Sequence, residues 1–557
     1  MTKMTTYTLA TDTRSFLSLF STFLLSLKLS KSGLKVGFLI SKSYPFAFSM
    51  EDGVKVLTTL ELDPGSRAVS IKCHISESRA KSLLAQFMVA RLIHCPEDRT
   101  RDSPAPNVPL QPTAKGLYVL SQHLQANPVP ASQQKNVSAL LSSNYNTMTC
   151  VTLVRDSNDV ISTSKYLTLL LFQRLAGKTP NLYSANDIGD LEDGRQSPYH
   201  HRYFTHPDSE AVTQYYVSSV GVRLLETTRD CDSKNPVFYF SGKAAWQWIM
   251  ECCEVVKGLE IIDILQEFTT AGFIERLNPE SREYGDTDSD SISSQKFVCS
   301  KAAKYCFTVS GMSVAGWTSN LPATPLSSGF PKFVKSRILH GIEVTKEELV
   351  ELQEIDQATN TTLDAATGRP VEVPKDDSDT ESKRESREER ILGYKHENPS
   401  LATILQDPGL TLLFRDYLES SHCVENHTVY VSTHEVICAF FELTQQHKKR
   451  TPESLASLLD LIYSTYDSYL SPQAPKEFNM TSTWRDELCL LTGKLRTVET
   501  VSESLLVVTE IVRVFDVIKT HAFRIMEIDS LPKFLECREY RRCLRTFRWL
   551  ERVKYVT

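Results

Sequence analysis

Residues 407–418 read DPGLTLLFRDYL and contain a complete start signal for an amphipathic helix. The Asp407 carboxylate can accept hydrogen bonds from the free N–H groups of a first helical turn. Pro408 suits the first helical position, because proline lacks the N–H that is unpaired there in any case. The apolar residues that follow fall on one stripe at helical spacing: Leu410, Leu413, Phe414, Tyr417 and Leu418. This stretch therefore predicts a helix that buries one face.

The rest of the C-terminal sequence repeats this pattern. Thr451-Pro452-Glu453 is a second helix start. The apolar face that follows it consists of Leu455, Leu458, Leu459, Ile462, Tyr463 and Tyr466. A third helical pattern runs from Ser504 to about Ile528, and no convincing strand alternation interrupts the region. We expect an all-α helical bundle.

The N-terminal half contains a weak internal repeat. Four apolar residues recur at a constant offset of 181 positions: Leu84, Phe87, Ala90 and Ile93 return as Leu265, Phe268, Ala271 and Ile274. In both copies an amphipathic helix leads into a short apolar strand. A second apolar segment follows a polar loop, KGLYVLSQHL at 115–124 and KYCFTVSGM at 304–312. Helices followed by a β-hairpin predict two winged-helix domains in tandem.

Two polar stretches and one apolar stretch bear on how the chain is divided. Residues 345–398 include PKDDSDTESKRESREER, which has no aromatic or aliphatic side chain and predicts a flexible linker. Phosphorylation at Ser378 or Thr380 is an alternative role for this linker. Residues 279–295 predict a long hairpin loop. The apolar stretch from Ser15 to Leu27 is too short to span a bilayer and predicts a core helix.

Composition narrows the class of protein. A chain of 557 residues suggests about three or four domains. Its formal net charge of −6 argues against a nucleic-acid binder, which needs a surplus of cations on one face. The helix of the first repeat that would enter a DNA groove, residues 76–92, has only Arg79, Lys81 and Arg91 as cations. We therefore expect no nucleic-acid partner.

The cysteines, histidines and other reactive residues indicate no metal site and no catalytic centre in the chain itself. The 13 cysteines include no C-x-x-C pair, and Cys438 and Cys489 stand among apolar residues. We expect buried reduced thiols and a cytoplasmic protein. His200, His201 and His206 lack the further ligands that a structural zinc site needs, and no nucleophile elbow or phosphate-binding loop is present. We expect no metal, no cofactor and no catalytic centre.

Three C-terminal segments resemble the motifs of the regulator of G-protein signalling (RGS) family, in the family's order. They are LFRDYLESSHCVENHTVYV (413–431), YDSYLSPQAPKEFNMTSTWRDEL (466–488) and FRIMEIDSLPKFLECREY (523–540). The family's arginine in the last motif is Lys533 here, and its aromatic pair after Glu-Asn is reduced to Val429-Tyr430. The sequence is also longer than in short members around Arg496 to Val508. These departures affect the choice of partner and leave the asparagines in place.

The N-terminal repeats resemble the DEP domains of the fungal DEP–RGS regulators. The matching segments are YPFAFSMEDGVKVLTTLEL (44–62), FSGKAAWQWIMECCEVV (240–256) and GLEIIDILQEFTTAGFIERL (258–277). The segment LVRDSNDVISTSKYLTLLLFQRLAG (153–177) looks like the family's connector. The resemblance implies a mainly α, multidomain fold with two winged-helix DEP domains followed by an all-α RGS bundle. The expected ranges are 1–135 for the first DEP-like domain, 136–225 for the connector, 226–344 for the second DEP domain, 345–397 for the charged linker and 398–557 for the RGS domain.

The resemblance implies a GTPase-activating protein for a heterotrimeric G-protein α subunit. Such a protein binds best to the transition-state arrangement of the α subunit's switch loops and so lowers the barrier without touching the phosphate. Asn479 would reach toward the catalytic glutamine and switch I, since an amide both donates and accepts hydrogen bonds. Glu425 and Asn426 would contact the switches from a neighbouring loop. Asp529 would accept bonds from switch I, and Lys533 would hold Asp529 in place.

The full set of residues that the resemblance assigns to α-subunit binding is Glu425, Asn426, Lys476, Asn479, Ser482, Ile525, Asp529, Ser530 and Lys533. For the residues given a role above, the alternative interpretation is loop capping, because Asn and Asp commonly close turns or cap helices. The rival interpretation is a non-catalytic adaptor or scaffold that binds the α subunit or a receptor tail without accelerating hydrolysis.

The same resemblance implies where the protein works. The DEP domains would bring it to a receptor's cytoplasmic tail or to the plasma membrane, as a peripherally associated cytoplasmic protein. The segment CREYRRCLRTFRWLERVK (537–554) carries six arginines with interleaved aromatic residues, which could rest on an anionic membrane. We favour a terminal helix with one solvated basic face.

Overall fold

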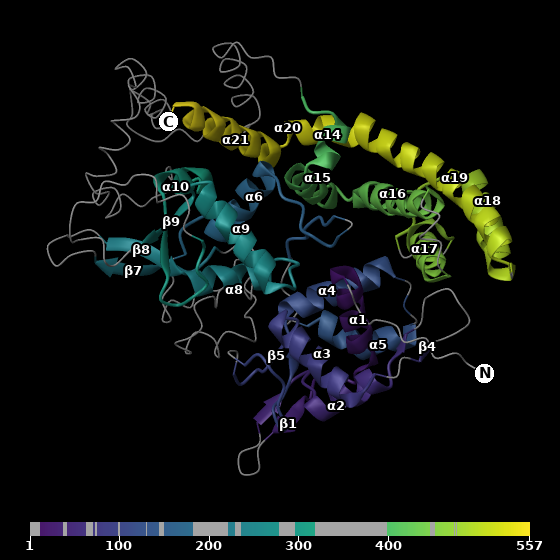
Figure 1. The fold of residues 1–557 in the computed structure, drawn as a ribbon, viewed down its shortest axis with the longest axis horizontal. Helices are drawn as coiled ribbons and strands as arrows, with labels where there is room; N and C mark the ends of the chain where they lie inside the picture. The colour runs from purple at the N-terminus through teal and green to yellow at the C-terminus, as the bar shows by residue number, and fades with distance from the viewer. Residues whose placement is uncertain are drawn as a thin grey trace, which may run out of the picture.

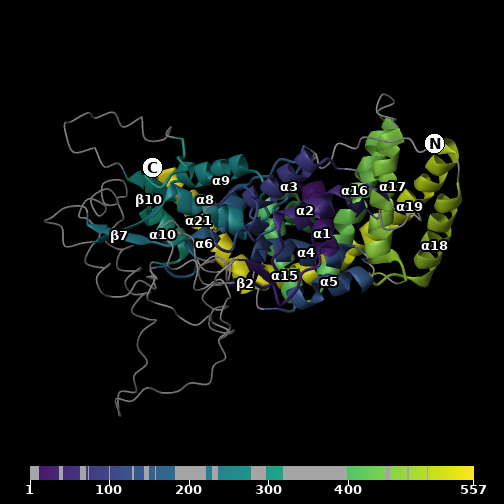
Figure 2. The same cartoon turned by 90° about the horizontal axis from the view of Figure 1, so that it is seen from below.

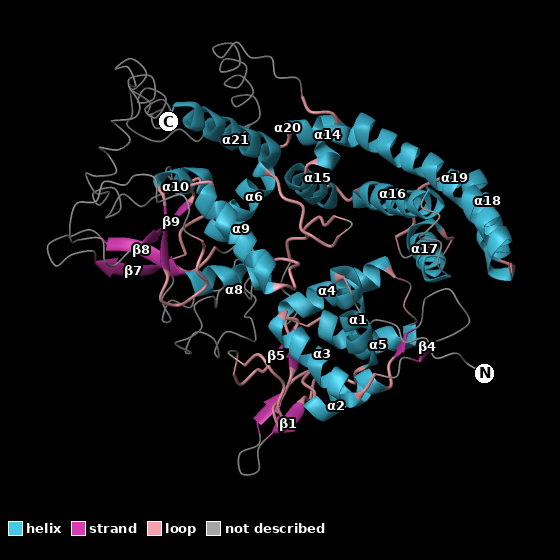
Figure 3. Cartoon of the chain, in the orientation of Figure 1, coloured by secondary structure: helices cyan, strands magenta, loops and turns pink. Residues whose placement is uncertain are grey.

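The computed structural model of the chain describes residues 12–36, 42–62, 71–72, 75–98, 101–127, 129, 131–143, 150–156, 158–181, 221–228, 236–277, 296–317, 398–445, 452–472, 474, 476–498 and 500–556. The described chain is mainly helical, and its strands lie in the N-terminal half (Figure 3). Figure 1 shows a first unit (12–143) at the lower centre, a second unit (165–317) at the left and a C-terminal unit (398–556) along the top and right. The loop 279–295, the linker 345–397 and His200, His201 and His206 lie outside the described residues.

The first unit begins with the helix predicted from the apolar stretch after Arg14. Its elements are α1 (Thr13–Ser26), β1 (Leu34–Val36), β2 (Lys42–Tyr44), α2 (Met50–Thr58), β3 (Glu61–Leu62), β4 (Ile71–Lys72), α3 (Glu77–Val89), β5 (Ile93–His94), β6 (Gln111–Pro112), α4 (Ala114–Ala126) and α5 (Ala131–Leu141). Asp12 caps α1 by accepting the Ser15 N–H at 2.9 Å. Phe20, Phe23 and Leu24 of α1 are fully buried, so the prediction of a core helix is confirmed.

The second unit contains a four-stranded antiparallel sheet in the order β7-β8-β10-β9. Its elements are α6 (Lys165–Ala176), β7 (Leu225–Thr228), β8 (Pro236–Ser241), α8 (Gly242–Cys252), α9 (Gly258–Thr270), β9 (Ile274–Leu277), β10 (Lys304–Phe307) and α10 (Val309–Ala315). Tyr305 pairs with Phe240 on one side of β10, and Phe307 pairs with Ile274 on the other.

The internal repeat has the same backbone geometry in both copies. Helices α3 and α9 start and end 181 positions apart, like the apolar residues that predicted them. Arg91 and Gly272, which follow them, both have positive φ, 57° and 73°. The hydroxyl groups of Thr113 and Thr308 donate to the carbonyl oxygens of these residues, each at 2.6 Å. The sequence repeat therefore corresponds to a structural repeat.

A glycine at the same place in each copy shows which helix opens the second unit. A Cβ on Gly116 would lie 2.2 Å from the Leu92 carbonyl oxygen, and one on Gly311 would lie 2.1 Å from that of Phe273. In each copy the added Cβ would also lie 3.1 Å from the ring of a first-helix phenylalanine, which is Phe20 of α1 for Gly116 and Phe172 of α6 for Gly311. Helix α6 is therefore the counterpart of α1. It lies inside the range 136–225 expected as a connector, but it packs as the first helix of the second unit.

One part of the repeat assignment was wrong. The segment KGLYVLSQHL was expected to be a strand equivalent to KYCFTVSGM, yet it forms helix α4. Thr113 caps that helix by accepting the Gly116 N–H at 3.0 Å, and the strand that pairs with β5 is the shorter β6 just before it. Leu117, Tyr118, Val119 and Leu120 are all buried, so consecutive apolar residues here reflect a helix enclosed on most sides.

The C-terminal unit is helical throughout its described residues. Its elements are α14 (Leu401–Gln406), α15 (Pro408–Ser420), α16 (Val424–Gln445), α17 (Pro452–Thr465), the π-helical turn η4 (Tyr466–Leu470), α18 (Ser482–Thr497), α19 (Val501–Ile525), the π-helical turn η5 (Met526–Ser530), α20 (Leu531–Glu536) and α21 (Arg538–Val556). Asp407 accepts the N–H groups of Gly409 and Leu410 at 2.8 and 2.9 Å, which confirms the predicted helix start. The residues from Arg496 to Val508 form the end of α18, the short turn after it and the start of α19 (Figure 1).

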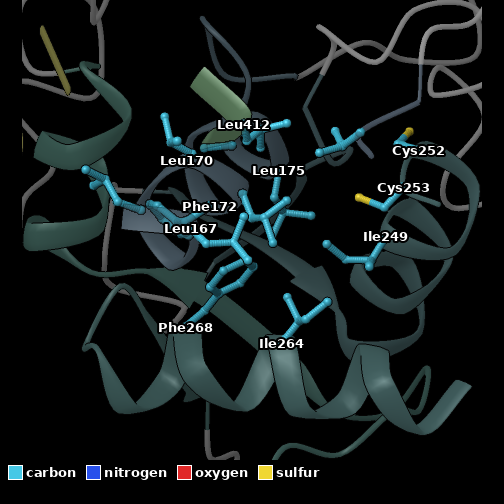
Figure 4. Close-up of a cluster of buried hydrophobic side chains, with 14 of the residues drawn as sticks. Leu167, Leu170, Phe172, Leu175, Ile249, Cys252, Cys253, Ile264, Phe268 and Leu412 are labelled. Carbon is cyan, nitrogen blue, oxygen red and sulfur yellow. The ribbon is translucent and has the colours of Figure 1, made fainter. Parts of the chain in front are cut away.

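The C-terminal unit divides between two hydrophobic cores. Helices α16 to α19 enclose a core of their own, with Val429, Ile462, Phe478 and Phe515 fully buried. Helices α14, α15, α20 and α21 instead share a core with the second unit. Figure 4 shows the α6 side chains Leu170, Phe172 and Leu175 among α8, α9 and Leu412 of α15. The ring of Tyr166 also stacks on Phe547 of α21, with centroids 4.1 Å apart. Helix α6 thus joins the second unit to the C-terminal unit.

The first unit also contacts the C-terminal helices. Figures 1 and 2 place it beside α16, and the Arg14 Nη1 atom lies 2.5 Å from the Glu435 Oε1 atom there. Arg415 of α15 donates to the Thr152 hydroxyl at 2.9 Å, in the segment that follows the first unit. All three units are therefore in contact with one another.

The expectation of buried thiols holds only in part. Cys95, Cys150, Cys252 and Cys253 are buried, whereas Cys438 and Cys489 are exposed. Both lie on the solvent side of α16 and α18: their neighbours Ile437 and Leu488 are buried, whereas Leu490 is 59 % exposed. Within the described ranges, no helix has the length and apolar character needed to cross a membrane.

Candidate binding surface on the C-terminal helices

Three separate segments of the C-terminal unit lie close together. The first is the junction of α15 and α16, the second is the loop after η4, and the third comprises η5 and α20. The Cys423 thiol of the first segment interacts with the Ser530 side chain of the third, which lowers the pKa of the thiol against the effect of burial. Lys476 of the second interacts electrostatically with Glu425 of the first. These segments contain seven of the nine residues that the sequence resemblance singled out, and the other two, Ser482 and Ile525, lie next to them at the start of α18 and the end of α19.

Glu425 and Asn426 lie in the first turn of α16. The Glu425 side chain is partly exposed, whereas Asn426 is only 8 % exposed. The Asn426 amide nitrogen donates to the Cys423 carbonyl oxygen at 3.4 Å, across its own loop. Asn426 therefore closes the α15–α16 junction, and Glu425 offers its carboxylate from the same turn.

Lys476 lies in a mixed environment of charges. Burial lowers the pKa of its ammonium, and the nearby Arg415 lowers it further. The carboxylates of Glu419 and Glu425 oppose this decrease. Its backbone N–H donates to the Ser468 carbonyl oxygen of η4 at 3.4 Å. Lys476 is thus a cation between two carboxylates at the start of the loop.

Asn479 is exposed, and its two neighbours in the chain are buried. Phe478 is fully buried, donates its N–H to the Tyr469 carbonyl oxygen at 2.8 Å and meets the ring of His521 edge-on at 6.2 Å. Met480 is 8 % exposed. Side chains fixed on either side of Asn479 restrict its backbone, so that its amide is presented to solvent from a defined position.

Ser482 and Ile525 border the loop. Ser482 is exposed at the first position of α18, and the capping residue Thr481 makes no side-chain cap bond. Ile525 is the partly buried last residue of α19, one helical turn beyond His521. His521 contacts both Phe478 and Trp484, at centroid distances of 6.2 and 5.2 Å. The two predicted residues therefore lie on the elements that hold the Asn479 loop.

The third segment contains an ion pair and a buried hydroxyl. Lys533 Nζ lies 2.6 Å from Asp529 Oδ1, and both side chains are largely exposed. This hydrogen bond raises the pKa of Lys533. Ser530 is only 2 % exposed, and its interaction with the Cys423 thiol shows that η5 lies against the α15–α16 junction. Ile528, just before Asp529, is 76 % exposed.

Both π-helical turns adjoin this surface. Turn η4 comes directly before the Asn479 loop, and turn η5 contains Asp529 and Ser530. A π-helical turn is rare and is frequently found at functional sites.

Sequence reasoning missed four residues that support the surface: Arg415, Glu419, His427 and Ser468. Arg415 Nε donates to Glu419 Oε1 at 3.3 Å, a pair spaced four residues apart that the sequence could have indicated. Burial lowers the pKa of His427 to about 4. Its Nε2 atom has no hydrogen-bond partner within the described part of the chain. Nothing in the sequence distinguishes Ser468 from any other serine.

The arrangement is suited to binding another protein. It presents an exposed amide at Asn479, carboxylates at Glu425 and Asp529, and cations at Lys476 and Lys533. Side chains of this kind, held by buried neighbours, can form several hydrogen bonds with the backbone of a mobile loop. The surface contains both signs of charge, which favours a partner with polar and charged loops over a uniformly charged polymer.

Comparison with known proteins agrees with the fold. Residues 15–140 match the family "Fungal-differentiation regulator winged helix domain", and residues 400–543 match the family "Regulator of G protein signaling domain". The chain is 25 % identical over 545 residues to the "Developmental regulator flbA" of Emericella nidulans. The aligned region covers 95 % of this chain and 63 % of that relative. The fold is therefore mainly helical and multidomain, with an N-terminal winged-helix domain and a C-terminal RGS helical domain.

Proposed function

We propose that this chain is a GTPase-activating protein for a heterotrimeric G-protein α subunit and so down-regulates receptor signalling. The observation that carries the proposal is the exposed Asn479 amide, held between two buried neighbours and bordered by segments from two other parts of the RGS domain. A match to the RGS family over residues 400–543 supports it, as does the similarity to a developmental regulator.

The proposed chemistry follows from the slow GTP hydrolysis of an isolated α subunit. Its switch loops only sometimes hold the glutamine and the attacking water in line, so hydrolysis is slow. A partner that binds those loops most tightly in their reactive arrangement increases the rate without donating a group to the phosphate. In this proposal Asn479 contacts the glutamine and switch I, and Asp529, oriented by Lys533, accepts hydrogen bonds from switch I. Glu425 and Lys476 contact the switches from the neighbouring segments.

We further propose that the two winged-helix units act as DEP domains. In this proposal they bring the protein to a receptor's cytoplasmic tail or to the plasma membrane, as a peripherally associated cytoplasmic protein. The sequence resemblance of both copies supports this, together with the repeat of α3 and α9. Sedimentation of the full chain with vesicles containing phosphatidylserine, compared with a receptor-tail peptide, would separate the two modes of recruitment.

The main experiment measures a single turnover of GTP hydrolysis by a purified α subunit, with and without the full chain. We expect a faster turnover and tighter binding to the α subunit with GDP and aluminium fluoride than with GDP alone, because that complex resembles the transition state. Equal binding to both forms would refute the proposed mechanism.

A second candidate function is a non-catalytic adaptor. Two observations favour it: the Asn426 amide is used inside its own loop, and Lys533 makes one hydrogen bond to Asp529 where an arginine could make two. An adaptor would bind the α subunit and leave the turnover rate unchanged, so the same experiment distinguishes the two functions.

A further inference from the structure

Helix α4 of the first unit connects distant parts of the molecule. At its start, the Lys115 ammonium donates to the carbonyl oxygens of Met250 and Val255 in the second unit, at 2.6 and 2.5 Å. In its middle, the Tyr118 hydroxyl lies 3.3 Å from the Thr152 hydroxyl, which also accepts from Arg415. The helix thus contacts the second unit at its start and is linked to α15 in its middle through the Thr152 hydroxyl.

The C-terminal end of α4 contacts the RGS domain directly. The hydroxyl of Ser468, a fully buried residue of η4, donates to the carbonyl oxygen of Ala126. Ala126 is the last residue of α4, and the final carbonyl groups of a helix have no partner inside it. Ser468 therefore satisfies a carbonyl group that the helix itself cannot satisfy.

Turn η4 holds the loop that carries Asn479. The Ser468 carbonyl oxygen accepts the N–H of Lys476 at 3.4 Å, and the adjacent Tyr469 carbonyl oxygen accepts that of Phe478 at 2.8 Å. The next residue after Phe478 is Asn479. A displacement of η4 relative to α4 would therefore be passed to Lys476 and Asn479 through two backbone hydrogen bonds.

A second contact fixes the same turn against the first unit. Tyr469 interacts electrostatically with Arg14 of α1 and also interacts with the Ser432 side chain of α16. Arg14 also pairs with Glu435 of α16. The first unit thus interacts with η4 through two helices: α4 by a hydrogen bond and α1 electrostatically.

We propose that Ser468 is a positioning residue, through which the end of α4 sets the loop that presents Lys476 and Asn479 to the α subunit. The expected effect of Ser468 on hydrolysis rests on the proposed function. Its expected effect on the geometry of the loop does not. It assigns a role to the first winged-helix unit beyond recruitment: that unit holds one part of the binding surface in its productive geometry.

The test uses the full chain with Ser468→Ala, which removes the hydroxyl and keeps the backbone carbonyl. The matched control is Ser471→Ala, because the Ser471 hydroxyl donates within its own turn to the Asp467 carbonyl oxygen at 3.3 Å. Hydrogen–deuterium exchange is followed in residues 471–481 and, for comparison, in the core of α19. We expect faster exchange at Lys476 and Phe478 in Ser468→Ala alone, with α19 unchanged.

The functional arm measures the affinity for the α subunit with GDP and aluminium fluoride. Ser468→Ala should weaken it about fivefold, the effect of losing one neutral hydrogen bond. The same substitution should have a smaller effect in an Asn479→Ala background, because only Lys476 then remains for Ser468 to position.

The outcomes separate the two proposals. Unchanged loop exchange in Ser468→Ala, or an equal increase in α19, would overturn the positioning role. If the wild-type chain binds no α subunit, the proposed function fails, and the exchange experiment still decides whether Ser468 holds the loop. Thr152→Val, which removes the hydroxyl shared by Tyr118 and Arg415, gives a second variant should Ser468→Ala not fold. Unchanged loop exchange in that variant would likewise overturn the coupling to α4.

Discussion

Lys533 Nζ contacts Asp529 Oδ1 at 2.6 Å across one helical turn, so the two residues at the end of the third segment orient each other on the surface of the protein. Both side chains are more than half exposed, and such pairs add little to folding stability. The pair is therefore better suited to orienting a carboxylate than to holding the fold together.

Lys533→Arg should increase the maximal stimulation of GTP hydrolysis. The planar guanidinium can bond both oxygens of Asp529, whereas the ammonium makes one contact. Lys533→Met should reduce stimulation, and neither change should alter the melting temperature by more than a degree or two. Single-turnover hydrolysis and thermal unfolding of the same preparations check this. Arg and Met variants with equal activity would contradict an orienting role for residue 533.

Asn479→Ala should reduce the stimulation of hydrolysis about tenfold or more, because it deletes a group that contacts the transition state. The side chain is exposed, so the fold should be unaffected. Asn158→Ala is the matched control, since Asn158 is also an exposed asparagine but lies in the segment between the first and second units. Stimulation that survives in Asn479→Ala, or that falls equally in the control, would argue against the assigned role.

Phe172→Ala should lower the free energy of unfolding by about 3–5 kcal/mol. Phe172 is fully buried and contacts the rings of Phe268, Phe273 and Phe307, at centroid distances of 5.5, 4.7 and 5.6 Å. Phe441→Ala is the control, because Phe441 is 51 % exposed and should cost under about 1 kcal/mol. Denaturant unfolding of the full chain measures both. Similar shifts for the two variants would show that α6 is not a central part of the core.

Stability should fall as the pH drops from about 6.5 towards 4, in part because of His427. Burial lowers the pKa of His427 to about 4, while its unfolded value is about 6.5. Above pH 6.5 the imidazole is neutral in both states, and between these values only the unfolded chain gains the proton. The loss would approach about 3 kcal/mol below pH 4.

His427→Gln should flatten this part of the pH profile of unfolding, whereas His422→Gln, at an exposed position, should leave it unchanged. Denaturant midpoints at several pH values between 4 and 7 test the expectation. A profile with the same slope in both variants would place the pH dependence on other groups.

Local signals in the sequence predicted the elements that depend on local contacts. Asp407 and Pro408 indicated the start of α15, because a cap bonds to residues two or three positions away. The apolar spacing of Leu84 to Ile93 indicated both α3 and α9. Helices α4 and α6 were harder to assign, since both are enclosed on most sides and lack the polar stripe that reveals a helical period.

The residues of the candidate surface were predicted by motif resemblance, whereas the residues that hold them in place were not predicted. Order along the chain identified the segments around Asn426, Asn479 and Asp529, but no periodicity shows that they meet. No local sequence pattern could indicate the role of Ser468, because its hydrogen-bond partner Ala126 is 342 positions away. Long-range hydrogen bonds of this kind arise from the packing of domains, which a single sequence does not encode in any local window.

The position of α6 has a consequence for how the protein is made. This helix opens the second unit, yet its other face packs on Leu412 and Phe547, which are synthesised more than 200 residues later. At typical ribosomal speeds the delay is roughly 10–50 seconds. During that interval the nascent chain exposes an apolar face, so its production in cells should depend on chaperones that bind such faces until translation ends.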